Sequence, residues 1–219
     1  MGFLRIFLVA LLPSFFLLSY TKPVAEEVRP VPLMNSSTKR DTIPDSVMTD
    51  FRKRIQVFPM GDLNGDGRPD TAILYPPYFK SPSDPVDEGC LGDCVCHIKF
   101  SCNLPELKGL VGIGGILANV GDLDNNGICE IAFVPDWFTS AWRNLDVYGY
   151  KNNKWQRFGT VSVYVDYMEE DPDYRKYFEK RVIKMDTHKF LLIGDSLNLN
   201  PGDKDTSFTV LRPTVFTFP

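Results

Sequence analysis

The sequence has no excess of positive charge and few residues of the types that most often carry catalysis. Over its 219 residues, 24 Lys and Arg face 28 Asp and Glu, which gives a formal net charge of −4. We therefore expect no nucleic acid partner, because nothing in this balance predicts a basic binding surface. Only two histidines occur, His97 and His188, and the GxSxG, Walker and HExxH patterns are absent. With the usual hydrolase and nucleotide-binding signatures missing, we assign no catalytic residue.

A long apolar run is also missing. The apolar stretch from Ile6 to about Tyr20 is interrupted by Pro13, so it is shorter than the roughly 20 residues that span a bilayer. Arg5 precedes it, which completes the pattern of a secretory signal. We expect a signal peptide over residues 1–20 and a flexible, proline-containing linker over 21–41. These features favour a secreted, periplasmic or cell-envelope location with no stable membrane span.

Cysteine is scarce, and its pattern leaves three interpretations open. Disulfides fit an exported protein, because they persist in oxidising compartments. Free buried thiols and a zinc site that includes His97 are the alternatives, although a strand over "CVCHIKF" would turn His97 away from Cys94 and Cys96. The odd count leaves at least one thiol unpaired within the chain, and the sequence does not give the connectivity. The five cysteines are Cys90, Cys94, Cys96, Cys102 and Cys129.

What the sequence does contain favours an all-β fold over residues 42–219. It has 17 prolines, 16 glycines and many short β-branched or aromatic runs separated by polar turns. A short N-terminal helix is expected in "IPDSVMTDFRKRI", with Asp45 able to cap it. Paired strands are then expected from "IQVFPM" to "KWQRFGTVSVYV", followed by a hairpin of "FEKRVIKM" and "KFLLIG" and by the strands "SFTVLR" and "TVFTF".

An acidic loop occurs twice in register. "GDLNGDGRPD" contains the first loop (residues 62–70), and "GDLDNNGICE" contains the second loop (residues 122–130), which begins 60 residues later. An apolar strand and a proline follow each loop. One such loop is weak evidence, because Asp, Asn and Gly also dominate ordinary hairpin turns. Two in register predict a repeated structural unit.

The spacing of oxygen-bearing residues in both loops is typical of calcium ligands. Calcium takes six to eight oxygens at about 2.3–2.6 Å, which a loop supplies from positions 1, 3, 5 and 9 and from the backbone carbonyl at position 7. Gly67 and Gly127 fill position 6, where the chain bends tightly. We predict two Ca²⁺ sites, the first more secure than the second. Their ligands are Asp62, Asn64, Asp66, Arg68 (carbonyl) and Asp70, and Asp122, Asp124, Asn126, Ile128 (carbonyl) and Glu130.

An EF-hand is excluded at both loops. That motif needs a glutamate at position 12 and a flanking helix on each side. Position 12 is Ile73 in the first loop and Phe133 in the second, and both lie in expected strands.

The segments "GDLNGDGRPDTAILYP" and "GDLDNNGICEIAFVP" resemble the FG-GAP or VCBS repeat, the calcium-loop blade of integrin alpha-subunit propellers and of many exported bacterial proteins. "LDVYGYKNNKWQRF" resembles the later strands of a blade. The resemblance covers about residues 55–165 and implies that each loop joins two strands of a four-stranded blade. It also implies that ligands meet the face opposite the metal.

The length departs from that family. A closed propeller needs at least four blades, whereas the repeat allows about two clear blades and a degenerate third, "VIKMDTHKFLLIG", which lacks the acidic loop. We therefore expect propeller-blade-like repeats in an incomplete propeller.

An aromatic segment follows the second loop and is the best candidate for recognition. Its rings suit a sugar or a peptide, and its arginine supplies a directed donor, although packing in the core is the simpler role. The segment contributes Trp137, Phe138, Trp142, Arg143 and Tyr148.

We expect a binding or adhesion domain for a polysaccharide or protein. The alternatives are a secreted carbohydrate-active hydrolase that uses scattered carboxylates, which would need two acids about 5–10 Å apart in a pocket, and a structural envelope protein.

Overall fold

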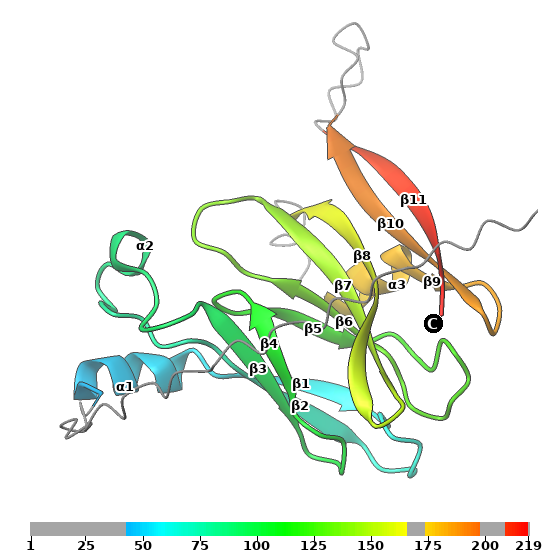
Figure 1. Cartoon of the computed structure of the whole chain (residues 1–219), viewed down its shortest axis with the longest axis horizontal. Helices are drawn as coiled ribbons and strands as arrows, with labels where there is room; N and C mark the ends of the chain where they lie inside the picture. Colours follow the sequence, from blue (N-terminus) through cyan, green and yellow to red (C-terminus); the bar gives the residue numbers. More distant parts are fainter. Residues whose placement is uncertain (1–42, 166–173, 198–208, 219) are drawn as a thin grey trace, which may run out of the picture. The chain divides into compact units, whose positions relative to one another are not determined.

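Antiparallel strands dominate the described part of the chain and form three sheets there (Figure 1). The computed structural model describes residues 43–165, 174–197 and 209–218. The expected signal peptide and linker lie outside this range. The expectation of a mostly β fold is confirmed.

The first sheet contains the first acidic loop. Its strands run in the order β1-β2-β3-β4, each antiparallel to the next. The first loop joins β1 to β2. The bounds are β1 Gln56–Gly61, β2 Asp70–Tyr75, β3 Val95–Phe100 and β4 Leu107–Val111.

The second sheet repeats this arrangement, which makes the two acidic loops structurally equivalent. Its order is β5-β6-β7-β8, again antiparallel throughout, and the second loop joins β5 to β6. The tight turn expected at "KNN" joins β7 to β8, where Asn152 and Asn153 both adopt positive φ. The bounds are β5 Gly115–Asn119, β6 Ile131–Pro135, β7 Trp142–Lys151 and β8 Lys154–Tyr164.

The third sheet differs from the expected strands in two places. Helix α3 (Tyr174–Arg181) takes the first half of the residues expected to form its first strand, so β9 is only Val182–Lys184. It pairs with β10 (Lys189–Leu197), which confirms the hairpin. Strand β11 (Thr209–Thr217) is continuous where two strands were expected. Pro213 does not break it, because β11 is an edge strand and a proline is tolerated there.

Two apolar clusters hold the three sheets together. The first cluster lies between the first and second sheets and includes Leu74, Ile98 and Phe133. The second cluster lies between the second sheet and the α3–β11 region and includes Val147 and Phe190. Adjacent residues of β6 point to opposite sides, so the second sheet contributes to both clusters.

Helix α1 (Asp45–Lys53) confirms the expected N-terminal helix, with one correction. Pro44 occupies the N-cap position, so Asp45 lies in the first turn and does not cap the helix. Val47 is buried, and Phe51 stacks on Tyr78 with ring centroids 4.2 Å apart. A second, one-turn helix, α2 (Pro85–Glu88), precedes β3. Neither these helices nor α3 is long and apolar enough to cross a membrane.

One disulfide forms, between Cys90 and Cys94, with an S–S distance of 2.03 Å. The other three cysteines are unpaired among the described residues. His97 does not join them: its ring stacks on Tyr75 and pairs with Glu106 at 3.2 Å. A zinc site is not formed from this segment, because its thiols and imidazole do not converge among the described residues.

Candidate metal centre and ligand pocket

Each acidic loop is closed by its own first carboxylate. Asp62 accepts the backbone N–H groups of Asp66 at 3.0 Å and Gly67 at 2.9 Å. Asp122 accepts the N–H groups four and five positions further on, again at 3.0 and 2.9 Å. The side chains at positions 3 and 5 accept further N–H groups in the same way in both loops. The loops therefore share one scaffold, although such bonds alone also stabilise ordinary turns.

Position 9 distinguishes the two loops. Asp70 accepts the backbone N–H of Leu63 at 3.0 Å through one oxygen and the hydroxyl of Ser101 at 3.2 Å through the other. Glu130 accepts the equivalent N–H, that of Leu123, at 2.6 Å through Oε2. Its Oε1 is buried and has no hydrogen-bond partner. A buried carboxylate oxygen in this state is costly unless a cation or a water completes it.

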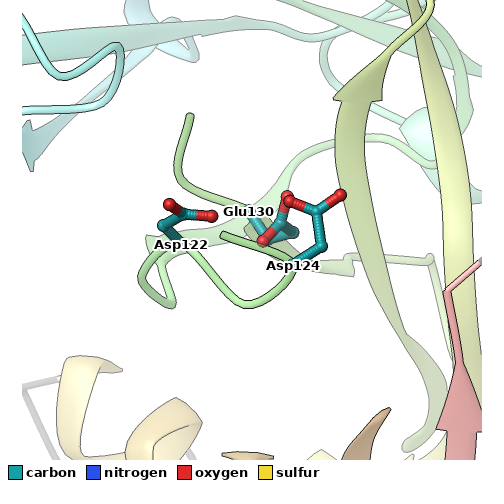
Figure 2. A group of neighbouring side chains, drawn as sticks. All are labelled: Asp122, Asp124 and Glu130. Atoms are coloured by element: carbon teal, nitrogen blue, oxygen red, sulfur yellow. The ribbon is translucent and has the colours of Figure 1, made fainter. Parts of the chain in front are cut away.

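Three carboxylates converge in the second loop, as Figure 2 shows. Asp122, Asp124 and Glu130 each offer an oxygen, and these oxygens all lie within 4.8 Å of one another. Two oxygens on opposite sides of a calcium ion are about 5 Å apart, so this spacing suits a shared ion. Among the described residues, this is the one group of at least three acidic, His or Cys side chains that converges in this way. The residues of the second loop therefore fit a hard cation.

The first loop does not bring its three carboxylates together in the same way. There the amide nitrogen of Asn64 donates to Asp66 at 3.2 Å and to Asn103 at the same distance. From the sequence, the first loop was expected to be the more secure of the two calcium sites. The convergence of carboxylates favours the second loop instead. The roles of the Arg68 and Ile128 carbonyls stay a prediction.

The electrostatics of the second loop also favour a cation. The pKa of Glu130 is raised to about 8, chiefly by burial and also by the neighbouring carboxylates of Asp124 and Asp122, against the lowering effect of the Leu123 N–H. Three acidic groups this close repel one another unless a positive charge lies between them.

Contacts tie the second loop, and Asn119 at the end of β5 before it, to both neighbouring sheets. The amide of Asn119 donates to the carbonyl of Met60 at 2.7 Å, and the N–H of Cys129 donates to the carbonyl of Leu63 at 2.9 Å. On the other side, the ammonium of Lys184 on β9 donates to the carbonyl of Asp122. The second loop is therefore held between the first loop and the third sheet.

A pocket of about 390 Å³ lies between β4 and the β6–β8 part of the second sheet. It contains four of the five residues expected to bind a ligand: Trp137, Trp142, Arg143 and Tyr148. Phe138 is not part of it and packs instead against Phe79, with ring centroids 5.7 Å apart. That these residues bind a ligand stays a prediction.

The floor of the pocket is one face of the β7–β8 hairpin. Asn144, Asp146 and Tyr148 alternate along β7, so they point to the same side as Trp142. Across the hairpin, Asn144 pairs with Ser162. Strand β6 pairs with β7 only from Asp146 to Tyr148, so the hairpin extends beyond β6 at the pocket.

An ion pair lies on this floor, and the sequence analysis missed it. Asp146 is 7% exposed, and Nη1 of Arg157 lies 3.5 Å from its Oδ1. The hydroxyl of Tyr148 lies 3.5 Å from its other oxygen. Burial raises the pKa of Asp146, against the lowering effects of Thr160 and Arg157. The period-two pattern Trp142-x-Asn144-x-Asp146-x-Tyr148 was the available signal, because it places polar and aromatic groups on one face.

Comparison with known proteins identifies no relative. No family model matches the chain, and neither a curated protein nor a solved structure matches it significantly. The resemblance to FG-GAP and VCBS repeats therefore remains a hypothesis, which is based on the residues of the two loops and not on a detected relative.

Proposed function

We propose that this chain is an exported, calcium-binding β-repeat domain whose first two sheets correspond to FG-GAP-like blades. The observation that carries the proposal is the convergence of Asp122, Asp124 and Glu130, each of which offers an oxygen within 4.8 Å of the others. Calcium there would neutralise the carboxylates and stabilise a loop that contacts both neighbouring sheets. The proposed ligands are those at positions 1, 3, 5, 7 and 9 of each loop.

The proposed role of the domain is to bind a polysaccharide or protein ligand in the pocket beside β7. Support comes from three rings, those of Trp137, Trp142 and Tyr148, that line one cavity together with charged side chains. Its volume of about 390 Å³ lies within the range of about 300–1,000 Å³ of small-molecule sites. The metal loops would stabilise the fold and take no part in catalysis.

Thermal melts with calcium and with a chelator test the metal. A ligand that binds only the folded state at 100 times its Kd adds about 2.7 kcal/mol to the free energy of unfolding. We expect a clear rise in Tm with calcium and a smaller rise with magnesium, which prefers fewer protein ligands. Coincident melts in calcium and chelator would remove the metal from the proposal.

A hydrolase is the second candidate, and one observation favours it. Two carboxylates, those of Asp136 and Asp146, line the same pocket, and a pair of acids is what glycoside hydrolysis requires. Incubation with chromogenic glycosides tests it: turnover that Asp146→Asn abolishes would favour the hydrolase, and binding without turnover would favour the binding domain.

A further inference from the structure

We propose that the pocket beside β7 binds a neutral saccharide, with its aromatic rings against the sugar faces and the Asp146–Arg157 ion pair against adjacent hydroxyl groups. This inference rests on the proposed binding role of the pocket. It chooses between the polysaccharide and the protein ligand, and it adds Asn144, Asp146 and Arg157 to the binding residues.

The charges that line the pocket exclude a strongly charged ligand. Two acidic residues, Asp136 and Asp146, are balanced by Arg143 and Arg157. Arg157 pairs with Asp146, and the guanidinium of Arg143 donates to the carbonyls of Trp142 at 3.2 Å and Trp137 at 3.1 Å. Because both arginines already have partners, the lining offers no cluster of free cations to an anion. The ligand that suits this lining is neutral.

The polar atoms of the lining match hydroxyl groups. Asp146 Oδ1 and Arg143 Nε are buried; Arg143 Nε has no hydrogen-bond partner, and Asp146 Oδ1 has none beside its 3.5 Å ion pair with Arg157. One is an acceptor and the other a donor, and a hydroxyl group serves both because it donates and accepts. A carboxylate beside a guanidinium likewise suits two neighbouring hydroxyls, one of which donates to Asp146 while the other accepts from Arg157.

The rings provide the apolar half of the site. Trp137 is 39% exposed, so part of its indole is available to a ligand. Trp142 is held edge-on against Tyr164, with centroids 5.3 Å apart, so its ring is oriented in advance. Aromatic faces next to planar polar groups suit the apolar and hydroxylated surfaces of a sugar ring. An extended peptide on the edge strand β4 is the competing occupant.

Titration of the full-length protein, followed by tryptophan fluorescence and calorimetry, tests the inference. The probes are neutral gluco-, manno- and galacto-oligosaccharides, an acidic oligogalacturonate, and a mixture of unstructured peptides. We expect binding by at least one neutral oligosaccharide. Trp137→Ala should weaken it by at least about tenfold, which corresponds to ~1.4 kcal/mol. Arg157→Lys should also weaken it, because lysine lacks the planar fork of arginine.

The controls are Arg52→Ala, on the exposed side of α1, and Trp155→Phe, because Trp155 packs against Tyr150 and Phe100 outside the pocket. Both should leave binding unchanged, and thermal melts establish that each variant folds. Binding of peptide or oligogalacturonate that Trp137→Ala abolishes, without any neutral saccharide, would overturn the inference and keep the proposed binding role. If no probe binds, both the saccharide inference and the proposed binding role of the pocket are overturned.

Discussion

Gly149 makes room for the buried carboxylate that distinguishes the second loop. A Cβ atom at residue 149 would lie 2.8 Å from Oε1 of Glu130 and 2.0 Å from Cε2 of Phe158. Any side chain here would displace the carboxylate, the ring or both. The position of Glu130 therefore depends on a residue of β7 that is distant in sequence.

We expect Gly149→Ala to destabilise the protein by about 1–3 kcal/mol, the usual cost of overpacking a well-packed core. Urea denaturation with and without calcium measures the loss in the free energy of unfolding. The increase in that free energy on adding calcium should also be smaller in the variant, because Glu130 would move.

Gly114→Ala is the matched control for that variant, because its Cβ would meet its nearest neighbour, Oδ2 of Asp136, at 3.4 Å, an ordinary contact. Equal losses of stability in the two variants would contradict the role assigned to the space at Gly149.

The two acidic loops have nearly the same backbone hydrogen bonds, but their carboxylates at position 9 differ in hydrogen bonding. In the first loop both oxygens of Asp70 have partners, whereas in the second one oxygen of Glu130 has none. An oxygen that already accepts hydrogen bonds must exchange them to bind a metal, while an orphaned one gains its first partner.

We therefore expect Glu130→Gln to remove more of the calcium-dependent rise in Tm than Asp70→Asn does. The two substitutions are matched, because each replaces a carboxylate at position 9 with its amide. Melts of both variants at a series of calcium concentrations measure the rise separately from any change in the stability of the metal-free protein. A larger effect of Asp70→Asn on the calcium-dependent rise in Tm would support the expectation from sequence that the first loop is the more secure calcium site.

Sequence patterns predicted the elements whose signals are local. The acidic loops, their flanking strands and the β7–β8 hairpin all follow from turn residues next to apolar runs. Strand β4 was missed because "LKGLV" has no regular alternation and contains Gly109, which adopts a positive φ of 74°. The Asp146–Arg157 pair was missed because it is diagonal across the hairpin: Asp146 is opposite Thr160 and Arg157 is opposite Tyr148, and composition does not reveal this register.

The second sheet links the two apolar clusters, so we expect the described domain to unfold as one unit. Ile131 and Phe133 pack into the first cluster, while Ala132 and Val134, which alternate with them on β6, pack into the second. Loss of either cluster exposes one face of this shared sheet to water. The contacts of Asn119 on β5 with Met60, and of Asp122 in the second loop with Lys184, couple the same three sheets at one end.

Phe190→Ala tests this coupling from the side remote from the first sheet. Phe190 is 0% exposed in the second cluster, so its truncation should cost about 3–5 kcal/mol. If the clusters unfold together, near-ultraviolet circular dichroism and calorimetry should report one transition at a lower Tm. Val215→Ala, at a position that is 52% exposed on β11, is the control and should change stability by less than about 0.5 kcal/mol. A split into two transitions, with the first cluster melting at the original Tm, would show that the sheets are independent units, because only an uncoupled first cluster keeps its stability when the second is weakened.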